Sequence, residues 1–205
     1  MTGASTRSDV AIAILAAGRG SRLAGDVPKP LVELRGRPLV GWSLEAATAS
    51  GLRPIVLVVG HGRAAVTRAA TEGVLVVRSR RWRRGIARSM RAALEALAPR
   101  AQVGAVCIGL ADQPLVGADA YRRLASAYRN GASLAVATYR GRRGNPVLLG
   151  RRLWDEARQL DGDVGARALM SDHDVVEVDC TDTGDARDVD TLDDLREAER
   201  LLEAR

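Results

Sequence analysis

The chain has 205 residues, 46% of them hydrophobic, and a formal net charge of +6 at pH 7. This predicts one domain at residues 9–205 after a disordered tail at residues 1–8, and the lack of a signal peptide or long apolar run predicts a cytoplasmic protein without a membrane partner. Only 3% of the residues are aromatic and no nucleic-acid-binding module is recognisable, so we expect no nucleic-acid partner despite the positive charge.

Apolar runs bounded by turn residues alternate with helix-like segments along the chain. The predicted elements, in chain order, are a strand at 10–16, a helix at 39–49, a strand at 54–59, a helix at 63–71, a strand at 74–77, a helix at 86–97, a strand at 103–109, a helix at 118–129, strands at 133–138 and 146–149, helices at 151–159 and 164–170, a strand at 174–178 and a helix at 192–203 capped by Thr191. This alternation predicts an α/β fold, a three-layer α/β/α Rossmann-like domain with a mostly parallel sheet. Its ligand is expected at the carboxyl ends of the strands.

The first predicted strand runs directly into the sequence GRGSR at residues 18–22. Glycines allow backbone N–H groups to approach an anion, and the two arginines add positive charge, so the loop predicts phosphate binding. A dinucleotide fingerprint would need a small residue in place of Leu23, and a Walker loop would need Ser or Thr in place of Pro30. The loop therefore fits neither of these common phosphate sites.

Lys29 is the single lysine in a chain whose other 30 basic residues are arginines. An ammonium group is a compact and flexible point charge that can follow a moving phosphate, whereas a guanidinium prefers a fixed, planar fork. An arginine-rich codon bias would produce the same ratio. Both a functional and an accidental origin of Lys29 therefore remain open at this point.

The segments LAAGRGSR at 15–22 and PKPL at 28–31 resemble the opening motif of nucleotidyltransferases with a Rossmann-like fold. The resemblance implies that the loop wraps the triphosphate of a nucleotide, and that Arg22 and Lys29 neutralise the phosphates as pyrophosphate leaves. The nucleotide-binding residues that it implies are Leu15, Ala16, Ala17, Gly18, Gly20, Ser21, Arg22, Lys29, Gly85, Ser89 and Asp112.

Further segments are similar to one branch, the MobA-like transferases, which comprises molybdenum cofactor cytidylyltransferases and their guanylyltransferase relatives. They are LADQP at 110–114, WRRGIARSMRAAL at 82–94, GNPVLL at 144–149, LDGDVGARALM at 160–170 and DVDTLDDL at 188–195, with Leu192 where proline is usual. The resemblance implies transfer of CMP from CTP to a phosphorylated pterin such as molybdopterin. A molybdoenzyme or its chaperone is then a possible further partner. The implied acceptor-binding residues are Gly144, Asn145, Gly162, Asp163, Gly165 and Arg167.

Asp112 is expected to hold Mg²⁺, because it follows a buried strand and because magnesium favours few carboxylates together with phosphate oxygens and water. By the resemblance, Asp190 is the candidate second ligand and Asp188 the reserve. Arg22, Lys29 and Asp112 form the expected catalytic set, with the two cations on the side of the phosphates opposite the metal. Such a site works by positioning and charge neutralisation, so no catalytic histidine is required.

Several alternatives remain open on the sequence alone. GTP or ATP could replace CTP, and another phosphorylated compound could be the acceptor. Some relatives of this branch are NAD(P)H-dependent oxidoreductases of the nicotine blue type, and a nucleotide-binding protein without catalysis is a third class. Seven arginines around Trp82 within residues 78–91 are consistent with a solvated surface, a funnel for anionic substrates or a nucleic-acid patch.

Overall fold

The structure is a computed structural model that describes residues 9–18 and 27–203. The predicted tail at residues 1–8 and the predicted site residues Gly20, Ser21 and Arg22 lie outside the described residues. Within the described part of the chain, no helix combines the length and apolar character needed to cross a membrane.

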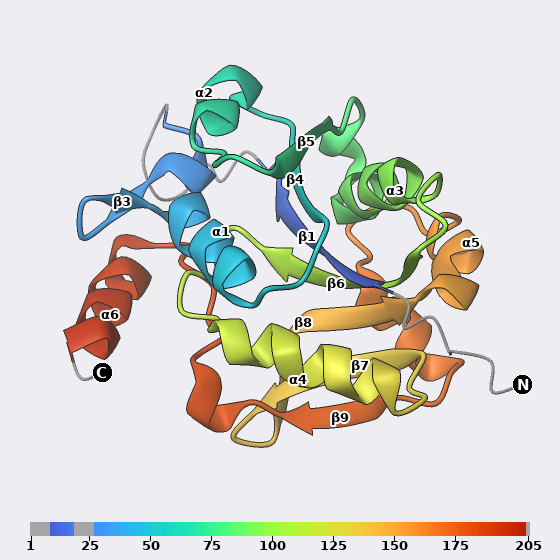
Figure 1. The fold of residues 1–205 in the computed structure, drawn as a ribbon. Coiled ribbons are helices and arrows are strands. Elements are labelled where there is room, and N and C mark those ends of the chain that lie inside the picture. The colour runs from blue at the N-terminus through green and yellow to red at the C-terminus, as the bar shows by residue number, and fades with distance from the viewer. Residues whose placement is uncertain (1–8, 19–26, 204–205) are drawn as a thin grey trace, which may run out of the picture.

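A seven-stranded sheet forms the centre of the molecule, with the strand order β5-β4-β1-β6-β8-β7-β9 (Figure 1). Its strands are β1 (Asp9–Ala16), β4 (Ile55–Val59), β5 (Val74–Arg78), β6 (Val103–Leu110), β7 (Leu134–Tyr139), β8 (Arg142–Gly150) and β9 (Val176–Asp179). Strand β8 pairs antiparallel with β6 and β7, while the other pairs are parallel. The predicted mostly parallel sheet is confirmed.

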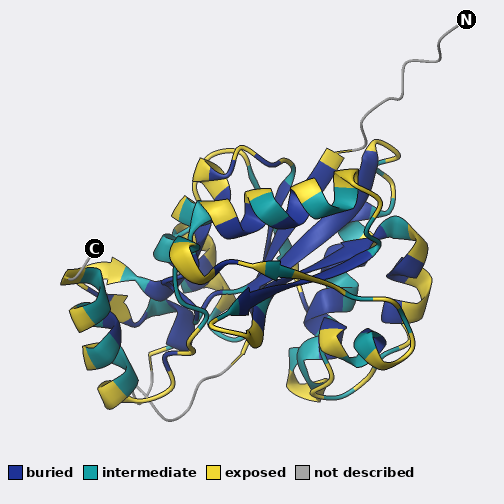
Figure 2. Cartoon of the chain, turned by 90° about the horizontal axis from the view of Figure 1, so that it is seen from below, coloured by how far each residue is buried: buried dark blue, intermediate teal, exposed yellow. Residues whose placement is uncertain are grey.

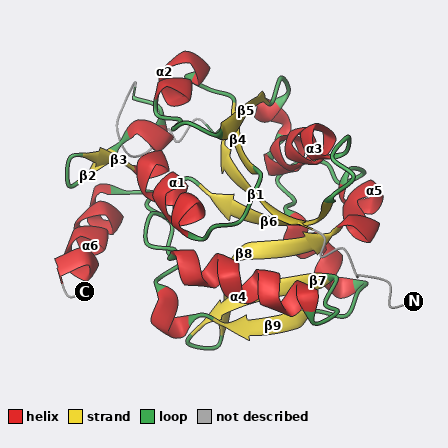
Figure 3. Cartoon of the chain, in the orientation of Figure 1, coloured by secondary structure: helices red, strands yellow, loops and turns green. Residues whose placement is uncertain are grey.

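Helices cover both faces of the sheet and make a three-layer α/β fold (Figure 3). Along β1, Val10, Ile12 and Ile14 point into the core below one helical layer, and the intervening residues point to the other face, as the two-residue period of a strand requires. Figure 2 shows the sheet buried between the two layers, while the outer faces of the helices are exposed. The first layer contains α1 (Leu39–Ala49), α2 (Arg63–Arg68) and α4 (Ala118–Arg129), and the second contains α3 (Ile86–Leu97) and α5 (Trp154–Ala157).

The last helix, α6 (Leu192–Glu203), packs beside a short hairpin of β2 (Glu33–Leu34) and β3 (Arg37–Pro38). The sequence did not predict this hairpin. Its turn places Arg35 and Gly36 at positive φ angles of 52° and 72°, the conformation of a tight two-residue hairpin turn. Arginine is not a typical residue there, so the turn gives little signal in the sequence.

Three other predicted elements differ from those observed. The helix predicted at 151–159 is a 3₁₀ turn, Arg151–Leu153, followed by the four-residue α5, and the strand predicted at 146–149 is the longer β8. The helix predicted at 164–170 is a 3₁₀ helix, Ala166–Ser171. Its buried residues, Ala166 and Leu169, are three positions apart, and this is the spacing that a 3₁₀ helix brings onto one face.

Candidate active site

The candidate site lies at the carboxyl ends of β1 and β6, which are adjacent parallel strands. From β1 the sheet continues to β4 and β5 on one side and to β6 on the other, so this is a point where the strand order reverses. The Ala111 amide donates a hydrogen bond to the Leu15 carbonyl at 3.1 Å. This bond joins the segment that follows β6, which carries Asp112, to the end of β1.

Lys29 lies between two carboxylates at this edge. Its Nζ is 2.5 Å from Asp112 Oδ2 and 2.6 Å from Asp190 Oδ1. The Lys29 side chain is 9% exposed, against 28% for Asp112 and 52% for Asp190. Burial alone lowers the pKa of Lys29, but the charges and hydrogen bonds of the two carboxylates outweigh it, and the net pKa is raised. Lys29 is therefore a charged ammonium at neutral pH.

The backbone around Asp190 is fixed from two directions. The Val189 amide donates to the Asp112 carbonyl at 2.9 Å, which pins the two aspartates to each other. Asp194 Oδ2 accepts from the Asp190 and Thr191 amides at 3.0 and 2.8 Å, while Thr191 Oγ1 accepts from the Asp194 amide at 3.2 Å. This reciprocal capping box confirms Thr191 as the helix cap and orients Asp190 at the start of α6.

Asp188 is held by a different partner. Gln113 Nε2 donates to Asp188 Oδ1 at 2.9 Å and to the Ala186 carbonyl at 2.8 Å. Partial desolvation and the negative charge of Asp112 raise the pKa of Asp188 above its usual value. The carboxylate that shares Lys29 with Asp112 is thus Asp190, and Asp188 lies beside this pair.

Asp112 and Asp190 fit a divalent cation of the magnesium type. Within the described residues, no group of three or more His, Cys, Asp and Glu side chains could hold a metal ion. The two carboxylates do direct an oxygen toward one point, the Lys29 ammonium. Magnesium takes one or two carboxylates and completes its shell with water and phosphate oxygens, so a two-carboxylate site meets its preference.

The structure adds contacts of Lys29 that the sequence interpretation did not include. The sequence interpretation placed Lys29 across the phosphates from the metal ligands, whereas the structure places its ammonium between them. The physical reason is that a buried ammonium needs a compensating charge, and these two carboxylates lie next to it.

A cavity of about 310 Å³ adjoins Asp112. The predicted nucleotide-binding residues that line it are Leu15, Ala17, Gly18, Gly85, Ser89 and Asp112, and they are joined by Trp82, Arg83, Ile86, Leu110 and Asp163. Ala16 instead packs into the core on the opposite face of the sheet. Trp82 and Arg83 were given no individual role in the sequence interpretation, although they open the segment similar to the nucleotide-side motif.

Gly85 connects this cavity to the loop at residues 161–165. Its φ is 102°, and a Cβ at this position would lie 2.0 Å from the Gly162 carbonyl oxygen. The Ala87 amide donates to the same oxygen at 3.2 Å. A glycine is therefore needed both for its backbone conformation and for the close approach of the two segments.

A second cavity, of about 510 Å³, shares Leu15, Ile86, Leu110 and Asp163 with the first, so the two adjoin. Four predicted acceptor-binding residues line it: Asn145, Asp163, Gly165 and Arg167. Gly144 does not line this cavity. A Cβ at Gly144 would point toward Ala186 and Tyr139, at 2.8 and 2.9 Å. Gln113, the neighbour of Asp112, also lines this cavity without having been predicted to do so.

A mostly parallel α/β sheet with a lysine and two carboxylates at its switch point belongs to the class of α/β proteins that bind a ligand in the crevice at the carboxyl ends of the strands. Residues 12–178 match the MobA-like NTP transferase domain, and the chain belongs to this family of nucleotidyltransferases.

Two curated relatives differ in how much of their length this chain covers. Bifunctional protein GlmU of Pelobacter propionicus is 38% identical over 154 residues, which are 74% of this chain and 33% of that protein. The chain thus spans a third of the length of this GlmU relative. Nicotine blue oxidoreductase of Paenarthrobacter nicotinovorans is 31% identical over 193 residues, which are 89% of this chain and 92% of that protein.

The solved structures show the same fold over almost the whole chain. Rv0371c of Mycobacterium tuberculosis H37Rv has a TM-score of 0.81 and 28% identity, with 95% of this chain and 99% of that chain covered. A structure of Rv0371c in complex with manganese has a TM-score of 0.75 and 31% identity, with 97% and 100% covered.

Proposed function

We propose that this chain is a Mg²⁺-dependent nucleotidyltransferase that transfers a nucleoside monophosphate from a nucleoside triphosphate to a phosphorylated acceptor and releases pyrophosphate. The observation that carries the proposal is the convergence of Lys29, Asp112 and Asp190 beside two adjoining cavities. CTP and a phosphorylated pterin such as molybdopterin are the favoured substrates. This choice rests on the motif resemblance at residues 110–114 and 160–170.

Asp112 and Asp190 would hold the cation, and the manganese complex of Rv0371c supports a divalent ion at a related fold. When bound, such an ion acts as a Lewis acid on phosphate oxygens and neutralises their charge. Lys29, together with Arg22 from the loop outside the described residues, would offset the charge on the departing pyrophosphate. Lys29 would turn to the phosphates when the cation takes over its two carboxylates, and Asp112, which it contacts, lines the first cavity.

The two cavities divide the substrates between them. The first, with the glycines of the loop after β1, takes the nucleotide, and the second takes the acceptor with Arg167 as the cation for its phosphate. The shared residues Leu15, Ile86 and Leu110 form the border at which the acceptor oxygen meets the α-phosphorus. Holding the two anions at this border is the main catalytic task.

An oxidoreductase is the second candidate, because nicotine blue oxidoreductase is similar over nearly its whole length. Reduction by a nicotinamide cofactor does not require a buried lysine between two carboxylates. The loop after β1 also lacks the third small residue of a dinucleotide fingerprint, since Leu23 stands there. Both features favour nucleotidyl transfer.

A thermal-shift panel separates these functions. CTP, GTP, ATP, UTP, NADH and NADPH are each added with and without Mg²⁺, since a ligand that binds the native state raises its melting temperature. We expect the largest rise with CTP, and only with Mg²⁺ present. Pyrophosphate release is then measured with molybdopterin as acceptor.

Stabilisation by NADH or NADPH, followed by oxidation of that cofactor with a dye, would establish the oxidoreductase instead. Nucleotide binding without pyrophosphate release from any acceptor tested would leave a binding protein and contradict the proposed reaction.

A further inference from the structure

A third cavity lies apart from the two substrate cavities, beside the end of β5 and one face of α3. Its volume is about 330 Å³. The residues that line it are Arg78, Ser79, Arg80, Arg81, Arg88, Arg91, Ala92 and Glu95, and among the described residues none of these also lines the first or second cavity. We call these residues the arginine pocket.

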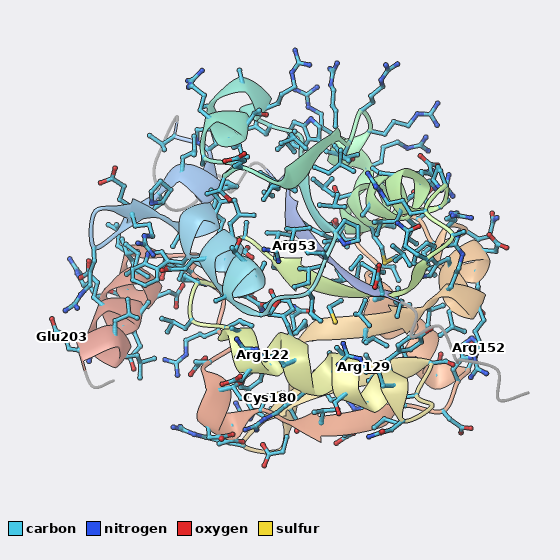
Figure 4. All side chains as sticks on the ribbon, in the orientation of Figure 1. Arg53, Arg122, Arg129, Arg152, Cys180 and Glu203 are labelled. Atoms are coloured by element: carbon cyan, nitrogen blue, oxygen red, sulfur yellow. The ribbon has the colours of Figure 1, made fainter. Side chains whose placement is uncertain are left out.

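The fold brings the arginines together from two directions. Arg88, Arg91 and Glu95 are three, four and seven positions apart and therefore share one face of α3, while the opposite face, with Met90 and Leu94, packs into the core. The end of β5 and the residues after it supply Arg78, Ser79, Arg80 and Arg81 to the same cavity. The Ser79 amide donates to the Val59 carbonyl at 2.8 Å and so holds this segment to the end of β4. Figure 4 shows nitrogen-tipped side chains extending outward above β5.

The positive charges of the arginine pocket are poorly compensated. Arg88 donates to Asp161 through both Nε and Nη2, at 3.0 and 2.8 Å, and Arg91 donates to the Arg158 carbonyl. By contrast, the side chains of Arg78, Arg80 and Arg81 form no hydrogen bond or ion pair with any described residue. Five arginines thus face one lining acid, Glu95. Like charges held in a concavity raise the local positive potential and attract an anion.

Two buried polar atoms in the same place lack partners. Ser79 is 2% exposed, and neither its Oγ nor Arg91 Nε has a hydrogen-bond partner among the described residues. Buried polar atoms without partners cost free energy, and both residues belong to the lining of the arginine pocket.

We propose that the arginine pocket is a second anion site, distinct from the substrate site, and that its ligand is a compact polyphosphate. Guanidinium groups bind phosphate oxygens through paired N–H donors, which suits a ligand with several phosphate groups. In the part of the chain that the structure describes, no aromatic residue lines the pocket, so this lining offers no stacking surface for the bases of a single strand.

Calorimetric titration with inorganic tripolyphosphate in metal-free buffer tests the proposal. The test variant combines Arg78→Ser, Arg80→Ser and Arg81→Ser. A control with the same loss of charge combines Arg129→Ser, Arg142→Ser and Arg152→Ser, which are exposed arginines on other parts of the surface; Arg129 and Arg152 lie well away from β5 in Figure 4. All six side chains are exposed, so both variants should fold, as circular dichroism would check.

We expect one binding step that the wild type and the control share and that is at least about tenfold weaker in the test variant. The affinity of this step should fall steeply as KCl is raised. Any binding at the substrate loop remains in all three proteins, so it does not obscure the comparison. If the test variant fails to fold, Arg80→Ser alone is compared with Arg129→Ser.

Equal titration curves for the three proteins, or no binding by the wild type, would overturn the site. A DNA duplex that displaces tripolyphosphate at lower concentration, with the same dependence on the three arginines, would assign the cluster to nucleic acid and overturn the polyphosphate ligand.

Discussion

Lys29 and the two aspartates that contact it differ in how far their charges are exposed to solvent. Lys29 is almost buried and needs a counter-charge, Asp112 is its less exposed partner, and Asp190 is half-exposed. The loss of a partner from a buried ion pair costs more than the loss of an exposed one, because solvent replaces the exposed partner more readily. The three side chains should therefore respond differently to substitution.

Asp112→Ala should remove activity and some stability. We expect kcat to fall by about a hundredfold or more, because one of the two carboxylates proposed to hold the cation is lost. The free energy of unfolding should fall by roughly 1–3 kcal/mol, because Lys29 keeps only its more exposed partner. Steady-state pyrophosphate release and chemical denaturation measure the two effects. Asp190→Ala serves as the comparison, with a similar loss of activity and a smaller loss of stability; metal-dependent turnover in Asp112→Ala would contradict the assignment.

Lys29→Met should bind a divalent cation more tightly than the wild type when no nucleotide is present. The Lys29 ammonium lies between the two carboxylates and competes with a cation for them, so its removal should raise Mn²⁺ affinity at least about tenfold. Electron paramagnetic resonance of free Mn²⁺ measures this binding directly. Lys29→Arg keeps the competing charge and should retain weak binding; an unchanged or weaker affinity in Lys29→Met would show that the ammonium does not occupy the cation position.

At the scale of the elements, the N-terminal ends of two helices, α6 and α3, position residues of the site. The capping box of α6 aims Asp190 toward Lys29, and the 3₁₀ turn before α3 (Trp82–Arg84) leads into Gly85 at the wall of the first cavity. Asp161 accepts from Arg88 on α3, and this bond, with the Gly162 amide, lowers the pKa of Asp161. The loop at 161–165 is thus tied to α3 by a charge pair and by the close approach at Gly85.

Gly85→Ala should separate these two segments. Gly131 is a control matched in φ, which is also 102°, and no described residue lies within 4 Å of the position of a Cβ there. Gly131→Ala should lower the free energy of unfolding by about 1–2 kcal/mol through backbone strain alone. Gly85→Ala adds the displacement of Gly162 to the backbone strain at its own φ of 102° and ψ of 172°, so it should be less stable than Gly131→Ala and lose most of the melting-temperature rise given by nucleotide and Mg²⁺. Equal effects of the two substitutions would show that the contact with Gly162 is unimportant.

At the scale of the whole molecule, the residues of the site lie at one edge of the sheet. Because β8 runs antiparallel, its first residues lie at the same edge as the last residues of β1 and β6, and this brings Asn145 to the second cavity. Strand β9 runs parallel to β7 and therefore ends at the same edge, and the chain that follows it supplies Asp188 and Asp190. The first layer of helices packs on one face of the sheet, and the core between them includes both cysteines.

The two cysteines report on the integrity of that core. Cys107 and Cys180 are buried, and burial raises the pKa of both thiols, that of Cys180 to about 11. Since the thiolate is the reactive form, neither should react with a disulfide reagent near pH 8 in the native protein, and both should react in guanidinium chloride. Cys180→Ser, which leaves one thiol, assigns the signals. One fast-reacting thiol in the native state would show that the first helical layer, whose α4 residues pack in the same core, opens readily.

The sequence by itself determined the α/β class, most of the regular elements and the capping residue of the last helix, because hydrophobic period and capping are local properties of the chain. It also singled out Lys29, Asp112 and Asp190, through one unusual residue and two motifs. Only the tertiary structure decided that Lys29 lies between the aspartates, which are 83 and 161 positions away in the chain. Their meeting depends on the strand order, the antiparallel β8 and the packing of α6, and these follow from how buried surfaces fit together rather than from any local pattern.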